Sequence, residues 1–404
     1  ADGATPPYTV VGQARTITQL QCYSNKLTAL DVTGCPALTT LFCFSNQLTA
    51  LDVSKNTALT RLECGNNPLG TLDVSKNTAL SGLNCYGNQL TALDVSKNTA
   101  LTGLTCFYNQ LGLLDVSKNT ALTSLNCGFN PLGTLDVSKN TAQTTLNCYD
   151  NQLTALDDSK NTALTRLECG NNQLASLDVS KNTALRSLDC SSNPLTALNV
   201  TNNTALTSLN CSYNQLTALN VTNNTALTTL SCGSNLLGTL DLSANTALVN
   251  LSCQGNLLST LDVTLHTALA TLNCGGNQLT ALDLSAHPEL RFLNCGGNQL
   301  TDLNLSNNPA LDSVWCFANQ LTALDVTHNP ALKRLRVQSN QLDAAALDAL
   351  FNTLPTGGSG KKVYIRNNPR SGGSAGTGTA GCDRSIAEGR GWEVNDTITT
   401  SQNN

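Results

Sequence analysis

The chain repeats itself every 21 residues from Ile17 to Gln341, without an insertion or a deletion. One copy reads "LNCYGNQLTALDVSKNTALTG" and begins at Leu83, and the next begins at Leu104. A unit of this length is too short to bury an apolar face by itself, so each copy must stack on its neighbours. The period therefore predicts a solenoid, whose length depends on the number of copies rather than on the size of one core.

Cysteine and asparagine each hold a fixed column of the repeat. Asparagine recurs sixteen times, from Asn25 to Asn340, three residues after the cysteine position. Its side-chain amide both donates and accepts, so stacked copies can satisfy the backbone groups that are freed where each strand ends. The cysteine column has fifteen members: Cys22, Cys43, Cys64, Cys85, Cys106, Cys127, Cys148, Cys169, Cys190, Cys211, Cys232, Cys253, Cys274, Cys295 and Cys316.

The template LxxLxCxxNxL, followed by TxLDVSxNTA, is the leucine-rich repeat pattern with cysteine in the third apolar position of the strand. The alternation in LxC predicts one short parallel strand per copy, with leucine and cysteine facing inward. The return segment is rich in Asp, Val, Ser, Asn and Thr, which are weak helix formers. The sequence thus predicts a gently curved solenoid with a parallel sheet on the concave face and short extended or 3₁₀ segments on the convex face.

The cysteine column is expected to be structural. In-register strands point neighbouring Cβ atoms in the same direction, which is poor geometry for a disulfide. Metal sites cluster their ligands at short spacings such as CxxC, and the chain contains no such motif. Thiols then act as small buried apolar groups. We expect no metal and no cofactor.

The two ends depart from the repeat. The predicted organisation is a short N-terminal cap (1–16), the repeat array (17–342), a C-terminal cap with one helix and irregular last coils (343–395), and a polar tail (396–404). In the C-terminal cap, Asp343 is a candidate N-cap, and Leu347, Leu350 and Phe351 follow at helical spacing. Residues 371–381 form a flexible loop by composition.

The repeat and the C-terminal segment resemble known bacterial proteins. Copies of 21 residues with a strand cysteine and the run "LDVSKNTALT" resemble the internalin J-like leucine-rich repeat proteins of bacterial surfaces. The segment "ALDALFNTLPTGGSGKKVYIRNNP", with "CDRSIAEGRGWEV", resembles the closing cap of cell-surface proteins from Bacteroidetes-type bacteria. The resemblance covers about residues 17–394 and implies an exported binding protein, often an adhesin. We expect a secreted or surface protein whose signal and anchor are not part of this chain.

Charge and hydropathy narrow the class of partner. The net charge of −5, from 22 basic and 27 acidic residues, gives no electrostatic footprint for nucleic acid. No apolar run reaches the roughly 18–20 residues that a transmembrane helix requires. We expect a monomer that binds a host or bacterial surface protein, or a glycan.

The aromatic residues of the repeats occupy four columns only, which are the two outward strand positions and the two positions after the cysteine. Strand alternation places these columns on the concave face and its rim. Exposed aromatic residues are typical of recognition surfaces, but cross-strand stacking that only stiffens the sheet gives the same pattern. The predicted ligand-binding residues are Tyr23, Phe42, Phe44, Arg61, Glu63, Tyr86, Phe107, Tyr108, Phe129, Tyr149, Phe292, Trp315, Phe317, Arg334 and Arg336.

The opposite side offers no chemistry of its own. A lysine column and an aspartate column run side by side, which predicts a solvated convex surface. His266 and His287 stack in one convex column and His328 lies in the next. No nucleophile–base arrangement surrounds them, so an enzyme is not expected.

One copy breaks the pattern. Gln143 replaces a leucine, and Asp158 replaces the inward valine of the return segment. An inward carboxylate is costly unless it is bonded, so residues 125–174 are predicted to be the weakest part of the middle of the array.

The sequence favours a non-enzymatic exported protein that binds a macromolecule through its concave face, in adhesion to host or other cells. Two alternatives stay open. A self-associating surface protein would contribute to a biofilm or envelope matrix. A glycan-binding module would use exposed Tyr and Trp beside Asn.

Overall fold

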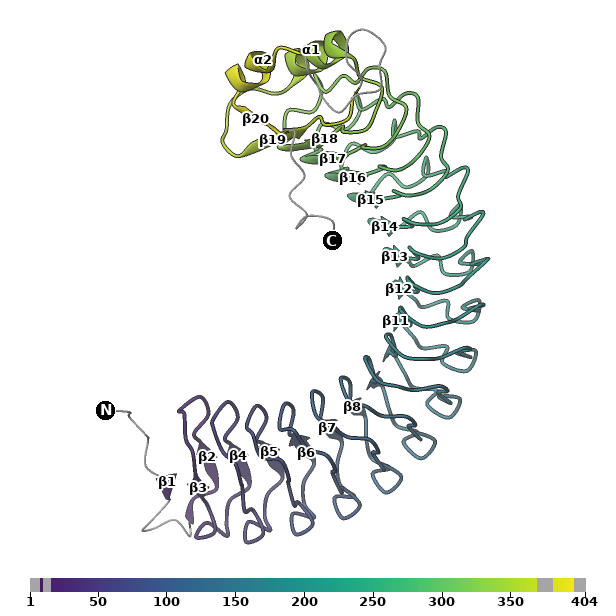
Figure 1. Cartoon of the computed structure of the whole chain (residues 1–404). Helices are drawn as coiled ribbons and strands as arrows, with labels where there is room; N and C mark the ends of the chain where they lie inside the picture. Colours follow the sequence, from purple (N-terminus) through teal and green to yellow (C-terminus); the bar gives the residue numbers. More distant parts are fainter. Residues whose placement is uncertain (1–7, 10–15, 369–380, 396–404) are drawn as a thin grey trace, which may run out of the picture. The chain divides into compact units, whose positions relative to one another are not determined.

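The computed structural model describes residues 8–9, 16–368 and 381–395, and the chain divides into two compact units at residues 205 and 206. In each unit the chain is a parallel β-solenoid in which one copy of the repeat makes one coil (Figure 1). The predicted leucine-rich repeat fold is confirmed. The polar tail 396–404 and most of the glycine-rich segment 371–381 lie outside the described residues.

The unit of residues 1–205 contains eleven strands, most of them only three residues long. In the repeat array, the strands pair in parallel with the strand of the next coil, and Leu62, for example, lies opposite Leu41 and Leu83. The short β1 pairs with β3 outside this sheet. The strands are β1 (Tyr8–Thr9), β2 (Gln19–Gln21), β3 (Leu30–Asp31), β4 (Thr40–Phe42), β5 (Arg61–Glu63), β6 (Gly82–Asn84), β7 (Gly103–Thr105), β8 (Ser124–Asn126), β9 (Thr145–Asn147), β10 (Arg166–Glu168) and β11 (Ser187–Asp189).

The unit of residues 206–404 continues the same repeat and ends in two helices. Its strands line the inner side of this unit's curve, and its return segments lie on the outer side (Figure 1). The strands are β12 (Ser208–Asn210), β13 (Thr229–Ser231), β14 (Asn250–Ser252), β15 (Thr271–Asn273), β16 (Phe292–Asn294), β17 (Ser313–Trp315), β18 (Arg334–Arg336), β19 (Lys361–Tyr364) and β20 (Trp392–Asn395). The helices are α1 (Ala344–Thr353) and α2 (Arg384–Gly389).

The core of each coil is made of the repeated apolar columns. In the coil that begins at Leu83, the side chains of Cys85, Leu90, Val95 and Leu101 are completely buried. Full burial of one such aliphatic side chain contributes about 1.5–3 kcal/mol. Since the register shift between coils is 21 residues, each side chain packs on its own counterpart above and below.

The asparagine column after each strand bonds the backbone of two neighbouring coils, as predicted. The Asn109 Nδ2 donates to the carbonyl oxygens of Cys85 and Cys106, at 3.1 and 2.9 Å. Its Oδ1 accepts from the backbone N–H groups of Asn88 and Leu90, both at 3.0 Å. This buried amide therefore satisfies donors and acceptors that the turn would otherwise leave unpaired.

The return segment contains two successive turns, each closed by an i→i+3 hydrogen bond as in a 3₁₀ helix. Asn98 N donates to Val95 O at 2.9 Å, and Leu101 N donates to Asn98 O at 3.1 Å. The Asn98 side chain is buried and donates to the carbonyls of Val74 and Asn77 in the preceding coil, at 3.0 and 2.9 Å. A second buried asparagine column thus closes most of the coils, which the sequence analysis did not recognise.

The prediction that His266 and His287 lie on the convex surface is wrong, because both rings are buried in this second asparagine column. The His266 Nε2 lies 3.1 Å from Leu242 O, and the His287 Nε2 lies 2.9 Å from Val263 O. An imidazole nitrogen reaches the same carbonyl of the preceding coil that the asparagine amide reaches elsewhere. These two histidines are structural replacements and not surface ligands.

The irregular coil around Asp158 has the inward carboxylate that the sequence predicted. Asp158 is 1 % exposed and Gln143 is fully buried. The Gln143 Oε1 accepts from Asn161 Nδ2 at 3.2 Å. Within the described residues, the Asp158 Oδ2 and the Gln143 Nε2 have no hydrogen-bond partner. Burial raises the pKa of the Asp158 carboxyl to about 7.

The C-terminal segment closes the last coil with helices and strands. The Asp343 side chain accepts from Ala346 N at 2.8 Å and caps α1, as expected. Leu347, Leu350 and Phe351 are buried beneath it. The short α2 follows β19 and precedes the last strand, β20. The Trp392 indole donates to Pro355 O at 2.9 Å and ties β20 to the chain after α1.

All seventeen cysteines are thiols, and all except the half-exposed Cys382 are buried. Desolvation raises the pKa of the Cys85, Cys127 and Cys253 thiols to about 12 and that of Cys22 to about 11. Since the thiolate is the reactive form, buried thiols of such high pKa are inert.

We therefore expect the folded protein to react with one equivalent of Ellman's reagent at pH 8, through Cys382. The protein unfolded in guanidinium should react with all seventeen equivalents. Absorbance of the released thiolate measures both values, and a Cys382→Ser variant is the control. Rapid reaction of several thiols in the folded protein would contradict the structural role of the column.

Candidate functional site

The outward side of the strands, which we call the sheet face, carries the predicted binding residues. Seven of them flank the central buried residue of a strand, and six follow the cysteine directly. Tyr108 and Phe129 stand one residue further, in the turn. The seven strand residues are Phe42, Arg61, Glu63, Phe292, Trp315, Arg334 and Arg336, and the six that follow a cysteine are Tyr23, Phe44, Tyr86, Phe107, Tyr149 and Phe317.

Five aromatic rings of residues 1–205 form a continuous row, which we call the aromatic ridge: Tyr86, Phe107, Tyr108, Phe129 and Tyr149. Their successive ring centroids are 4.9, 5.4, 4.2 and 5.5 Å apart. The Tyr86–Phe107 and Tyr108–Phe129 pairs are stacked, with interplanar angles of 6° and 17°. Much of the area of the ring faces is thus turned toward a neighbouring ring, and the ring edges are left for contact with other molecules.

Glycines make room for the two ends of the ridge. A Cβ atom at Gly65 would lie 2.2 Å from the Tyr86 ring, and one at Gly170 would lie 2.8 Å from the Tyr149 ring. Both distances are too short for any side chain, so these glycines let the terminal rings lie flat over the adjoining coil. Tyr23 and Phe44 form a separate stacked pair, at 4.6 Å and 3°.

The second position after the cysteine has a left-handed backbone. Its φ is +53° at both Tyr108 and Phe129 and +56° at Tyr213. Bulky residues rarely adopt this conformation, which costs roughly 1–2 kcal/mol without a glycine. Other copies hold Ser, Asn, Asp, Gly or Ala there. Tyr108 and Tyr213 are also 56 and 62 % exposed, so these tyrosines combine backbone strain with exposure.

A hollow of about 340 Å³ lies in the sheet face beside the first rings of the ridge. We call it the glycine hollow, because Gly82 and Gly103 line it where most other copies have Thr, Ser or Arg. A Cβ atom at Gly103 would meet nothing within 4 Å. The sequence analysis missed this feature, although two consecutive glycines in an outward strand column were its visible sign.

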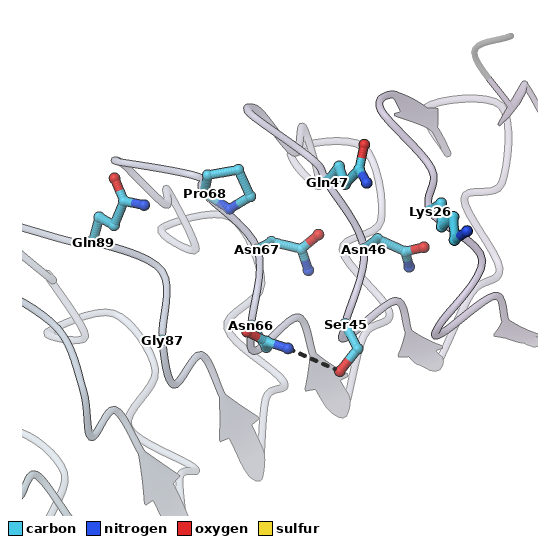
Figure 2. A pocket seen from close by; sticks show the side chains of 9 residues that line it. All are labelled: Lys26, Ser45, Asn46, Gln47, Asn66, Asn67, Pro68, Gly87 and Gln89. Atoms are coloured by element: carbon cyan, nitrogen blue, oxygen red, sulfur yellow. Dashed lines mark hydrogen bonds between the residues drawn. The ribbon is translucent and has the colours of Figure 1, made fainter. Parts of the chain in front are cut away.

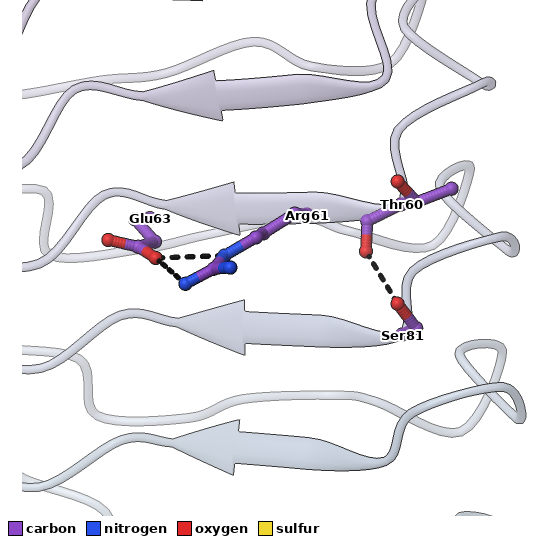
Figure 3. Close-up of polar contacts among 4 residues, drawn as sticks. All are labelled: Thr60, Arg61, Glu63 and Ser81. Atoms are coloured by element: carbon purple, nitrogen blue, oxygen red, sulfur yellow. Dashed lines mark hydrogen bonds and ion pairs between the residues drawn. The ribbon is translucent and has the colours of Figure 1, made fainter.

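Arg61 and Glu63 line the glycine hollow. Figure 3 shows the Arg61 guanidinium reaching along its own strand to Glu63, and the Nη2–Oε1 distance is 2.6 Å. The guanidinium carbon also lies 5.2 Å from the centroid of the Phe42 ring. The structure thus brings Phe42, Arg61 and Glu63 together, and Arg61 and Glu63 form a charged wall of the hollow.

A second hollow of about 290 Å³ runs along the turns of the first coils, between Lys26 and Gln89 (Figure 2). The amide nitrogens of Asn46 and Asn67 donate to backbone carbonyls there. Asn66 Nδ2 donates to Ser45 Oγ at 3.2 Å (Figure 2). Its lining is polar and mostly engaged in holding the turns, and it offers no pair of groups suited to acid–base chemistry.

The C-terminal residues of the predicted set form a separate cluster in the unit of residues 206–404. Phe292 and Trp315 meet edge to face at 5.1 Å. The Arg336 guanidinium lies 4.4 Å from the Trp315 ring centroid and 5.2 Å from that of Tyr364, which the prediction did not include. Phe317 lies one column away, over Gly296.

The described residues hold neither a grouped set of metal ligands nor a membrane-spanning helix. In residues 16–368 and 381–395, no three His, Cys, Asp or Glu side chains are grouped as ligands of a metal ion. Neither α1 nor α2 has the length and apolar character of a membrane-spanning helix. The sheet face is a broad surface that carries aromatic and charged side chains and the glycine hollow.

No protein-family model and no curated protein matches the sequence. Among solved structures, the functional domain of InlJ from Listeria monocytogenes, which includes a cysteine ladder, is 37 % identical. The match covers 87 % of this chain and 75 % of that one, with a TM-score of 0.76. YopM from Yersinia enterocolitica is 24 % identical over 94 % and 83 % of the two chains, with a TM-score of 0.66. Internalin InlF from L. monocytogenes is 24 % identical over 76 % and 89 %, with a TM-score of 0.64.

Proposed function

Because this chain belongs to the internalin-like leucine-rich repeat proteins, we propose that it is a secreted or surface bacterial protein that binds a partner protein through its sheet face. Its role would be adhesion to host or other cells. Solenoids of this kind present an extended surface on which many side chains act together. The observation that carries the proposal is the aromatic ridge beside the glycine hollow, in residues 1–205.

The ridge and the hollow complement each other as parts of a protein interface. Aromatic residues and arginine are enriched where protein partners bury their contacts, and hot spots lie in well-packed pockets. The hollow is about 340 Å³ in volume, with Arg61 and Glu63 in its wall. It could receive one large side chain of a partner while the ring edges contact the surrounding segment.

The stacking of the ridge favours a protein over a glycan. Sugar recognition by aromatic residues needs an open ring face, whereas the Tyr86–Phe107 and Tyr108–Phe129 pairs cover faces with one another. Stacking alone would also be explained by stiffening of the sheet. The hollow supports the recognition explanation, because an open space contributes nothing to stiffness.

We expect Gly103→Gln to abolish or weaken partner binding at least about tenfold, since the new side chain occupies the hollow. It should not destabilise the fold, because a Cβ atom at Gly103 meets no other atom within 4 Å. Gly133→Gln is the matched control, since Gly133 is equally open but lies away from the sheet face. Binding is measured on an array of purified extracellular proteins, glycans and the protein itself.

If Gly103→Gln still binds every molecule on the array that the natural protein binds, the glycine hollow is not the binding site. Hits confined to glycans would support the glycan-binding alternative. Hits confined to the protein itself, with assembly that increases with concentration in sedimentation, would support the matrix alternative. Thermal unfolding of both variants shows whether a loss of binding comes from a blocked surface or from a loss of stability.

A further inference from the structure

The C-terminal part of the sheet face carries an excess of positive charge on a chain whose net charge is −5. Five cationic side chains gather on β16 to β19 and the residues just before these strands, and we call them the basic cluster: Arg291, Lys333, Arg334, Arg336 and Lys362. Two acidic residues accompany them, Asp312 and Glu393. The cluster is unlike the lysine column of the return segments, where each lysine has an aspartate of its own coil nearby.

The register of the strands places these cations in adjoining columns. Arg334 lies opposite Lys362, so their backbones are one strand spacing apart, about 4.8 Å. Asp312 N donates to Arg291 O, and Lys333 N donates to Asp312 O, which puts Arg291 and Lys333 in one column, two coils apart. The cationic groups therefore extend over four coils, from β16 to β19, rather than a single point.

Most of this charge is not neutralised by the protein. Glu393 pairs with Lys362, at 3.2 Å. In the part of the chain that the structure describes, no carboxylate lies within 4 Å of the side-chain nitrogens of Arg291, Lys333 or Arg334. All three side chains are exposed. An acidic ligand could reach them without displacing an existing ion pair.

Aromatic rings order the centre of the cluster. The Arg336 guanidinium lies between the Trp315 and Tyr364 rings, on strands that flank its own. A guanidinium stacked in this way is held in place before a ligand arrives, which lowers the entropic cost of binding. Trp, Tyr and Arg are the residue types enriched at binding hot spots in protein interfaces.

We propose that the basic cluster is a docking surface for an acidic segment of a partner protein. An anionic polysaccharide has the same charge, but the faces of Trp315 and Tyr364 that a sugar ring would need are turned toward Arg336. A polypeptide can place carboxylates on the exposed cations and apolar side chains on the ring edges. The inference rests on the proposed function only in taking the sheet face as the recognition surface.

The test uses the full chain and a fluorescein-labelled decaglutamate peptide, with binding followed by fluorescence anisotropy at low and high salt. The variant Arg291→Gln, Lys333→Gln, Arg334→Gln removes three exposed charges and leaves the stacked Arg336 intact. It is expected to weaken binding about tenfold, since each exposed charge pair contributes a factor of a few. The salt dependence should decrease in parallel.

The matched control Lys97→Gln, Lys118→Gln, Lys139→Gln removes the same charge from the return segments and should change the affinity less than about twofold. Equal weakening by both variants would overturn the proposal, because binding would then follow net charge alone. Absence of peptide binding would overturn it as well. A third result would also overturn it: heparin binds, the triple arginine and lysine variant weakens heparin binding, and decaglutamate does not bind. The surface would then be a polysaccharide site.

The peptide does not require the glycine hollow, so Gly103→Gln should bind decaglutamate normally. A failure of the basic cluster is thereby distinguished from a failure of the proposed partner site. Unchanged thermal unfolding of the two triple variants shows that the exposed positions tested do not contribute to folding.

Discussion

Asp158→Val is expected to raise the free energy of unfolding by roughly 4 kcal/mol more at pH 8 than at pH 4. The folded-state pKa of this carboxyl is about 7, well above the value of 3.8 that an exposed aspartate has. The folded protein therefore keeps a proton that the unfolded chain releases above pH 4. The stability of the natural protein should fall as the pH rises from about 4 to about 7, and the valine variant should lack this loss.

The repeat itself supports this expectation. Val137 and Val179, the counterparts of Asp158 in the two neighbouring coils, are completely buried. Valine at position 158 would continue that column without a new cavity. The Asp158 Oδ2 has no partner among the described residues, so this oxygen offers no compensation for its burial.

Urea unfolding followed by circular dichroism at pH 4, 6 and 8 measures the effect. Asp157→Asn is the control, since Asp157 is exposed and an amide oxygen can still accept from Ser159 N, as Asn199 does from Thr201 N. It should reduce the pH dependence far less than Asp158→Val does, since burial is the main cause of the raised pKa of Asp158 and the Asp157 charge is a smaller one. Amide exchange in residues 125–174 should slow in Asp158→Val at pH 8. An equal gain in stability at every pH would show that the carboxylate is not the cause.

Asn109→Ala should lower the free energy of unfolding of the array by about 3 kcal/mol or more. The amide satisfies the carbonyls of Cys85 and Cys106 and the N–H groups of Asn88 and Leu90. A small apolar residue would leave these backbone groups buried without partners, and each such group costs roughly 1–3 kcal/mol.

Asn109→Asp separates the two halves of the amide. The carboxylate can still accept from Asn88 N and Leu90 N, but it faces the carbonyl oxygens of Cys85 and Cys106 without a hydrogen to donate. We expect it to be at least as harmful as alanine at pH 8. Asn84→Ala, on the sheet face, should cost less than about 0.5 kcal/mol. Denaturant unfolding compares the three variants, and similar losses for Asn84→Ala and Asn109→Ala would contradict the assigned role.

The sequence predicted the parts of the fold that repeat. The same residue at the same position of every copy indicates that this position has the same surroundings in every coil. The inward leucine and cysteine, the asparagine after each strand and the helix capped by Asp343 were all read in this way. The aromatic and charged residues of the sheet face were placed by strand alternation, and their use in binding stays a prediction.

Features that depend on three-dimensional context were missed. The buried asparagines of the return segments look like solvated polar residues in the sequence, because only the structure shows the carbonyls that they contact. The same reason explains the error over His266 and His287. Gly82 and Gly103 form a hollow by lacking side chains, and an alternation pattern records only the side chains that are present. The stacking of the ridge depends on left-handed turns at Tyr108 and Phe129, which no propensity of tyrosine or phenylalanine predicts.

The spacing of the hydrogen bonds has a consequence for how such a chain can change over generations. The bonds of the two asparagine columns join residues that are 19, 21 or 24 positions apart in neighbouring coils. Duplication or loss of 21 residues recreates every one of these bonds, whereas gain or loss of one residue would break several columns at once. Recombination between copies can therefore lengthen or shorten the sheet face by whole coils. Unequal crossing-over thus changes the area available for binding without changing the fold.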